Sequence, residues 1–220
     1  MRSLCPKSLV FALLAAFVVA FGAAPVGAAN GAARMQTPRR AAEKRDALET
    51  FREKHNAVMA LVRKRVKASI LQTEVDKLLD YKSLSQAALG GKKRYEKNCA
   101  PRCDEFEALL TRLIRENYLR LIRKGEKHPI RYIDQVRGRR GVFKVRTEIR
   151  VNRNGRERVH EIAYVMHRVD NLWRVRDIRT DGMSLIKNYK YELNKVRKEE
   201  GINGIIARLE SKLTDLAKND

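Results

Sequence analysis

The stretch Phe143-Lys-Val-Arg-Thr-Glu-Ile-Arg-Val151 alternates between charged side chains and side chains that are apolar or, at Thr147, small. A period of two places successive side chains on opposite faces of a β-strand, so this stretch predicts a strand with one apolar face and one wet face. The pair Asn154-Gly155 follows, and it is typical of a tight hairpin turn because both central positions of that turn require positive φ. We therefore expect this strand to open an antiparallel hairpin.

Three further segments predict partner strands for the same sheet. They lie at about 129–136, where the pattern is weaker, at about 157–169 and at 172–180. Ile162, Tyr164 and Met166 share one face of the second segment. Trp173 and Val175 share one face of the third, so the predicted sheet has a continuous apolar side.

The rest of the chain has the periodicity of amphipathic helices, in which apolar side chains recur every three or four residues. Five helices are expected. The first begins at Arg39, the second covers about 70–90 and ends at Gly90-Gly91, and the third begins after Cys103 with Asp104 as its cap. The fourth is capped by Ser184 and ends at Gly201, and the fifth begins at Ile202. Helices, an antiparallel sheet and again helices make an α+β fold, and residues 39–220 are expected to form one domain.

The first residues have the anatomy of a cleavable secretory signal. Arg2 and Lys7 precede an apolar run over 9–21, and small residues follow it. The run is too short and wrongly flanked for a membrane-spanning helix, the alternative being an uncleaved anchor. We expect residues 1–29 to be removed on export and residues 30–38 to form a disordered leader.

The chain is strongly basic, with 48 Lys and Arg against 26 Asp and Glu, a formal charge of +22. This excess favours anionic partners, either nucleic acid or anionic lipid headgroups. An exported protein seldom meets nucleic acid, and aromatic residues, at 6% of the chain, offer few platforms for stacking bases. We therefore expect no nucleic-acid partner. The basic strand residues are expected to form a cationic face, which is either only solvated or attracts headgroups during transient membrane contact; they are Lys144, Arg146, Arg150, Arg174 and Arg176.

Two cysteines remain once the signal, which carries Cys5, has been removed. Cys99 and Cys103 form an even pair in an oxidising compartment, which favours a disulfide. Pro101 between them indicates a turn that could bring them within bridging distance. A zinc site is the alternative, but two sulfurs without a nearby histidine make a poor one.

Catalytic and metal-binding motifs are missing from the sequence. His160 and His167 lie seven residues apart on one predicted strand and so face opposite sides, which prevents them from sharing a metal. The segment Gly182-Met-Ser-Leu-Ile186 lacks the second glycine of a nucleophile elbow, so Ser184 is expected to cap a helix. We expect no enzymatic activity, no metal and no cofactor.

The apolar side of the predicted sheet allows two interpretations. Its side chains either form an ordinary core beneath the helices or line an elongated cavity for acyl chains. Composition does not distinguish a packed core from a ligand cavity, because an apolar pocket and an apolar core use the same residues. The side chains concerned are Phe143, Val145, Ile149, Ile162, Tyr164, Met166, Trp173 and Val175.

One segment resembles a stretch of the MlaC and toluene-tolerance proteins, and it reads Trp173-Arg-Val-Arg-Asp-Ile-Arg-Thr-Asp-Gly-Met-Ser-Leu-Ile-Lys-Asn-Tyr189. In that family a tryptophan strand leads through an aspartate and a Gly-x-Ser-Leu turn into a helix bearing Asn-Tyr. Gly201-Ile-Asn-Gly204 looks like the family's glycine before its last helix, and Asp80-Tyr81 resembles its Asp-aromatic pair. The similarity extends over about 40–215.

This resemblance implies an NTF2-like fold, in which a curved antiparallel sheet and amphipathic helices enclose an apolar pocket for phospholipid acyl chains. It implies a periplasmic carrier that moves phospholipid between an outer-membrane lipoprotein complex and an inner-membrane ABC transporter complex, and so maintains the lipid asymmetry of the outer membrane. Phospholipid would be the cargo of a monomeric protein. The motif adds Met183 and Tyr189 to the expected pocket residues.

Asp177 keeps an enzyme alternative open. NTF2-like folds also host isomerases and hydratases that use a buried acid, and strict alternation places Asp177 on the same face as Trp173 and Val175. The same alternation would put Ile178 among the arginines, which indicates either a bulge or a side chain facing elsewhere.

Overall fold

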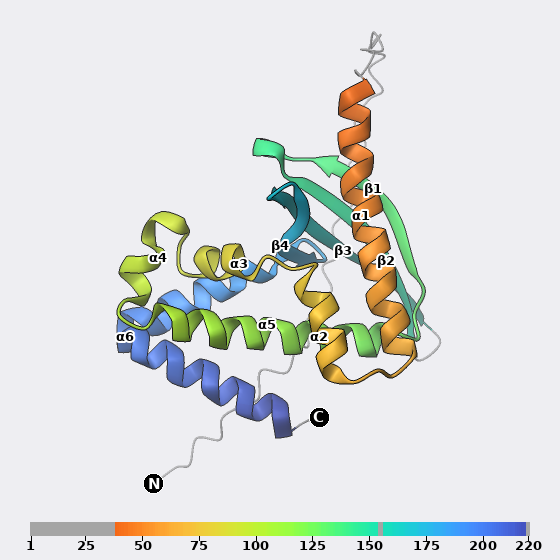
Figure 1. Cartoon of the computed structure of the whole chain (residues 1–220). Coiled ribbons are helices and arrows are strands. Elements are labelled where there is room, and N and C mark those ends of the chain that lie inside the picture. The colour runs from red at the N-terminus through yellow and green to blue at the C-terminus, as the bar shows by residue number, and fades with distance from the viewer. Residues whose placement is uncertain (1–37, 154–155, 219–220) are drawn as a thin grey trace, which may run out of the picture. The chain divides into compact units, whose positions relative to one another are not determined.

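The computed structural model describes residues 38–153 and 156–218, which form helices packed on one antiparallel sheet (Figure 1). The helices are α1 Pro38–Arg63, α2 Ala68–Asp76, α3 Tyr81–Ala88, α4 Lys92–Cys99, α5 Cys103–Gly125, the short 3-10 helix η1 Arg139–Gly141, and α6 Leu185–Lys218. The strands are β1 Ile130–Arg137, β2 Phe143–Arg153, β3 Arg156–Val169, β4 Leu172–Thr180 and β5 Met183–Ser184. The predicted α+β fold is confirmed.

Three predictions fall wholly or mainly outside the described residues. They are the signal peptide over 1–29, the leader over 30–38 and the hairpin turn at Asn154-Gly155. Pro38 is the exception within the leader, because α1 begins there.

The strands follow one another in space in their chain order, β1-β2-β3-β4-β5, each antiparallel to the next. Val145 of β2 lies opposite Tyr164 of β3, and Tyr164 lies opposite Ile178 of β4. Side chains opposite one another share a face of the sheet, so these three rows build one surface. We call this the inner face, and it is the apolar side predicted by the alternation.

A bulge in β4 changes the predicted face of two residues. Val165 lies opposite Asp177 whereas Met166 lies opposite Val175, which leaves Arg176 as the extra residue. An extra residue shifts the alternation by one beyond it. Ile178 therefore returns to the inner face and is buried, and the prediction that Asp177 shares the face of Val175 is wrong.

The predicted helix over 70–90 is two helices, α2 and α3. The chain between them joins the edge of the sheet, where Leu79 pairs with Val175 of β4 in a parallel bridge. Asp80 then caps α3 by accepting a hydrogen bond from the Ser83 N–H, 3.0 Å away. Leu78 and Leu79 are buried and continue the apolar pattern across the break between α2 and α3. The periodicity of the sequence therefore does not reveal that the helix ends there.

The other helices differ from prediction at α4 and α5 and follow it at α6. The separate helix α4 was not predicted, and α5 starts at Cys103 with Arg102 at the cap position in place of Asp104. Ser184 does cap α6, since its Oγ accepts a hydrogen bond from the Lys187 N–H at 3.0 Å. Gly201, with φ 68, interrupts α6 where a helix end was expected.

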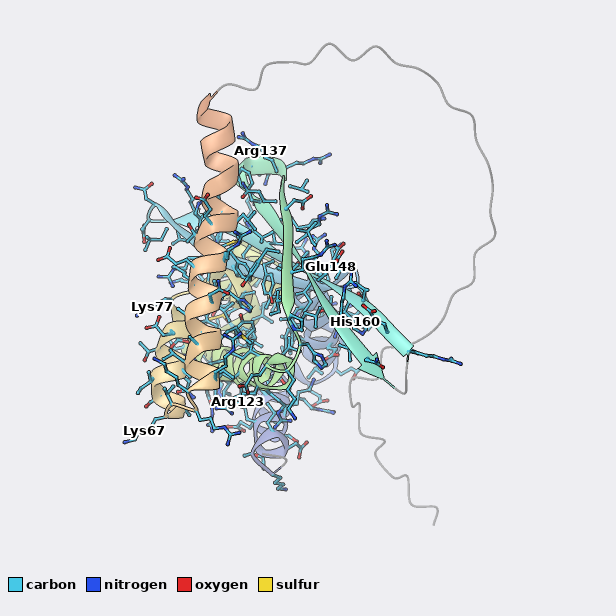
Figure 2. All side chains as sticks on the ribbon, turned by 90° about the vertical axis from the view of Figure 1, so that its right-hand side faces the viewer. Lys67, Lys77, Arg123, Arg137, Glu148 and His160 are labelled. Atoms are coloured by element: carbon cyan, nitrogen blue, oxygen red, sulfur yellow. A yellow bond between two sulfur atoms is a disulfide. The ribbon has the colours of Figure 1, made fainter. Side chains whose placement is uncertain are left out.

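Helix α1 lies across β1 and β2 (Figure 1), whereas α3 and α6 pack against β4. Figure 2 shows Arg137 at one end of the sheet and His160 toward the other. Helices α3, α4, α5 and α6 pack on one another and complete the core. Within 38–153 and 156–218, no helix combines the length and the apolar character that crossing a membrane requires.

Candidate functional site

The inner face brings together most of the predicted pocket residues. Strand pairing places Phe143 opposite Met166, Val145 opposite Tyr164, and Met166 opposite Val175. The predicted residues on this face are Phe143, Val145, Ile149, Ile162, Tyr164, Met166, Trp173 and Val175. All of them are buried except Ile149, which is partly buried. We call these residues, together with Phe51 of α1, which packs on Tyr164, the apolar layer.

Two predicted pocket residues lie elsewhere. Met183 is on the short strand β5 at the far edge of the sheet and is 47% exposed. Tyr189 is on α6 and packs partly buried against the core, where burial raises the pKa of its hydroxyl to about 12. The motif that pointed to them continues past the sheet, so adjacency in sequence does not bring them onto its inner face.

Aromatic side chains close the apolar layer. Phe51 of α1 packs on Tyr164 of β3 with ring centroids 4.1 Å apart. At the end of the layer Phe143 meets Trp173 edge to face at 5.3 Å. These contacts are of the favourable aromatic type, so the predicted walls rest on one another and on α1.

His55 is a buried polar residue that the sequence reasoning did not single out. It lies one turn after Phe51 on the covered face of α1, and its ring stacks on Phe51 at 5.2 Å. The hydroxyl of Tyr132 donates to Asn56 Oδ1, so the His55 Nδ1–H donates to that hydroxyl oxygen at 2.8 Å. Burial lowers the pKa of His55 to about 4, which keeps the ring neutral. The spacing Phe51, His55, Val58 is the signal that could have revealed it.

Some polar atoms in the interior lack partners. His55 Nε2 and the Tyr118 hydroxyl are buried and make no hydrogen bond within the described part of the chain. Burial raises the pKa of Tyr118 well above its ordinary value, and it raises that of Tyr164 as well. Unpaired buried polar atoms are costly, and they favour a ligand or water that can reach them.

The cationic surface that the sequence predicted is partly neutralised, because three of its five basic residues have partners. Arg146 pairs with Asp134, with its Nε 2.7 Å from a carboxylate oxygen, and Arg150 pairs with Glu157 at 3.1 Å. Arg174 donates to the Asp76 carbonyl at 2.8 Å. Acidic residues from neighbouring strands thus neutralise much of this face. The alternation pattern of a single strand does not show which residues of other strands lie beside it, so these partners could not be predicted.

Asp177 is occupied by structural contacts. Its carboxylate accepts from the Ser184 hydroxyl at 2.8 Å and from the Ile186 N–H at 3.2 Å, and it lies 3.4 Å from Arg179 Nε. A carboxylate held in this way fixes the turn into α6. The acid on which the enzyme alternative depended therefore lies outside the apolar layer.

The remaining candidate chemistry is structural. A disulfide joins Cys99 and Cys103, whose Cα atoms are 4.7 Å apart. In the part of the chain that the structure describes, no cluster of His, Cys, Asp and Glu side chains could hold a metal ion.

The fold and the apolar layer define an α+β protein in which a curved antiparallel sheet packs its apolar face against helices, among them α1. The same fold is found in the structure of a phospholipid-binding protein from Ralstonia solanacearum in complex with a phospholipid, with a TM-score of 0.62 and 21% identity. The match covers 78% of this chain and 99% of that one. The chain belongs to the MlaC family, since the sequence model described as MlaC protein matches residues 46–211. A comparison with curated proteins found no match.

Proposed function

We propose that this protein is a periplasmic carrier of phospholipids and that the apolar layer holds their acyl chains. The observation that carries the proposal is the inner face itself. Phe143, Val145, Met166 and Val175 form a continuous apolar surface, each at most 1% exposed, and α1 lies across the β1–β2 part of the sheet. The phospholipid bound by the Ralstonia solanacearum protein of the same fold supports this choice of ligand.

Acyl chains suit such a surface for an energetic reason. Moving one methylene group from water into an apolar site contributes about 0.8 kcal/mol. A chain of many methylenes therefore binds firmly without any directional contact, and the surface needs only the right shape. The headgroup keeps its water if it stays at the rim of the layer.

Loading requires the layer to open. Phe51 occupies the space beside Tyr164, so an acyl chain must displace its ring or move α1. The polar contacts between the described residues of α1 and the sheet include the bond from the Leu48 N–H to Gln135 Oε1 at 3.0 Å and the bond from His55 to Tyr132. We infer that α1 is the element that shifts when lipid enters.

The transport role rests on family membership and on the secretory pattern over 1–29. A protein that shields acyl chains can carry a phospholipid across the aqueous space between two membranes. The proposed partners are an inner-membrane ABC transporter complex and an outer-membrane lipoprotein complex, with outer-membrane lipid asymmetry as the outcome. The mature protein would act as a monomer without catalysis.

The experiment is mass spectrometry of the mature protein purified from a bacterial periplasm. Native spectra should show stoichiometric phospholipid, and organic extraction should release the same lipid. Protein that has been unfolded and exposed to the same lipid serves as the control for adventitious binding. A lipid-free mass, together with no uptake from mixed phosphatidylglycerol and phosphatidylethanolamine vesicles, would refute the carrier function.

A further inference from the structure

A cavity of about 240 Å³ lies where the loop from β1 to β2 meets the turn from β3 to β4. Its walls include the apolar pair Phe143 and Trp173 and, from three separate segments, four arginines. Those arginines are Arg137, Arg140, Arg168 and Arg176. Arg137, labelled in Figure 2, marks this end of the sheet. We call this the arginine cavity.

The described lining of the arginine cavity is cationic. None of the described residues that line it is acidic. Arg140 and Arg176 are exposed at its rim, and their side chains make no hydrogen bond or ion pair within 38–153 and 156–218. The guanidinium groups of Arg140 and Arg176 beside one small volume produce a positive potential that favours an anion.

Local backbone features direct these side chains. Arg176 is the extra residue of the β4 bulge, and bulges typically re-aim a side chain beside a functional site. Arg140 has a φ of 57, a left-handed conformation that glycine would adopt more easily. Arg168 lies over the Trp173 ring at 5.0 Å, and Arg137 lies over Phe143 at 5.9 Å.

Trp173 supplies a hydrogen-bond donor of a different kind. The side chain is 5% exposed, and its indole Nε1–H is buried without a partner among the described residues. The ring also lines the arginine cavity. Buried donors are normally satisfied, so an unpaired one in the same cavity as Arg140 and Arg176 favours an oxygen-rich anion as the missing acceptor.

The position of the cavity suggests the source of that anion. Phe143 and Trp173 belong both to its wall and to the apolar layer. A molecule with an anionic group at one end and a long apolar body could occupy both places at once. Phosphate esters of diacylglycerol have this construction.

We propose that the arginine cavity binds the phosphate of an anionic phospholipid whose acyl chains lie in the apolar layer, so that the protein prefers lipids with a net negative headgroup. This inference rests on the proposed carrier function and adds the class of headgroup. Guanidinium groups bind phosphate oxygens through charge-assisted hydrogen bonds, and a zwitterionic headgroup would bring its own cation into a cavity that is already positive.

The test compares two lipids with the same acyl chains. Delipidated mature protein is mixed with vesicles of dioleoylphosphatidylglycerol or of dioleoylphosphatidylcholine, and lipid per protein is measured after separation. The chain has one tryptophan, so Trp173 emission reports occupancy of this site without a label. Phosphatidylglycerol should load more fully, and Arg140→Gln with Arg176→Gln should lower its affinity roughly five- to tenfold and lower that of phosphatidylcholine by a smaller factor, so that the preference narrows.

A second cationic cavity provides the matched control. Lys187 and Lys190 of α6 line a separate cavity of about 400 Å³ beside Arg94 of α4. Changing both lysines to glutamine removes the same charge and should leave the loading of both lipids intact. If both double variants weakened phosphatidylglycerol equally, or if wild-type protein loaded the two lipids equally, the headgroup site would be refuted.

Free phosphate is the other source of the same chemistry. Millimolar inorganic phosphate should not release bound phosphatidylglycerol, because it lacks the acyl chains. Saturable binding of phosphate alone, with displacement of the lipid, would assign the cavity to a free anion and overturn the proposal. If neither lipid loads, the carrier function itself fails, a result distinct from loss of preference in a protein that still loads both.

Discussion

His55 of α1 donates a hydrogen bond to the Tyr132 hydroxyl of β1, with 2.8 Å between Nδ1 and the oxygen, beneath the helix that covers the sheet. Burial lowers the pKa of His55 to about 4, from 6.5. Above pH 6.5 the histidine is neutral in both folded and unfolded protein. Between pH 6.5 and 4 the unfolded chain takes up a proton that the folded protein does not bind, so the free energy of unfolding should fall by up to about 3 kcal/mol.

The measurement is chemical unfolding at a series of pH values for wild type and for His55→Gln. Glutamine has no proton to bind in this range, so the variant should show a flatter slope between pH 6.5 and 4. His128→Gln, at the end of the α5–β1 connection, is the control and should keep the wild-type slope. Parallel profiles for wild type and His55→Gln would contradict the assignment of the buried neutral histidine.

Asp80 links a helix start to the sheet. Burial alone would raise the pKa of Asp80, but the hydrogen bonds from His167 and Ser83 lower it to about 2. The carboxylate thus stabilises the fold above about pH 4, and this contribution is lost as the pH falls toward 2. At pH 7, Asp80→Ala should cost about 2 to 3 kcal/mol, since it removes a helix cap and a charged hydrogen bond at 2.7 Å.

Asp80→Asn separates the two contributions. Asparagine can still cap α3 but carries no charge for His167, so it should lose about half as much stability as alanine in urea unfolding. Equal losses for alanine and asparagine would mean that the cap contributes nothing and would contradict this interpretation.

The disulfide between Cys99 and Cys103 closes a very short loop. The chain-entropy argument gives a stabilisation of roughly 2 kcal/mol for a loop of this size, a small value because the entropy grows with loop length. Reduction, or the double change Cys99→Ala with Cys103→Ala, should lower the free energy of unfolding by about that amount and leave the far-ultraviolet circular dichroism unchanged. The double variant should not respond to reductant. Complete unfolding on reduction would show that the bridge is essential to the fold.

The sheet could be predicted from the sequence, and the contacts between its elements could not. Strict alternation from Phe143 onward specifies which face is apolar, and the observed register follows it. The bulge at Arg176 depends on how β4 meets β3, which no pattern within β4 reveals. The same holds for Arg146, whose partner Asp134 belongs to another strand.

The candidate site was predictable to the same degree. The apolar wall formed by the strands could be predicted from local alternation. Phe51, which packs on that wall at Tyr164, could not, because it belongs to a helix more than ninety residues earlier in the sequence. His55 was missed because a single histidine on an apolar helix face looks like an exception to the pattern. The arginine cavity forms from three separate turns and strand ends, so only the fold brings its residues together.

Phe51→Ala tests whether the apolar layer holds acyl chains. Phe51 is fully buried against Tyr164, and truncating a buried phenylalanine costs about 3 to 5 kcal/mol because it leaves a cavity. If acyl chains enter beside Tyr164, they fill that cavity, so the variant should lose much less stability when loaded with lipid than when lipid-free. Thermal unfolding of delipidated and phosphatidylglycerol-loaded protein measures the difference. Phe106→Ala is the matched control, since Phe106 is equally buried but packs beside Tyr95 in the helical part of the core. It should lose the same stability with and without lipid, and the same behaviour from Phe51→Ala would place the acyl chains away from the layer between α1 and the sheet.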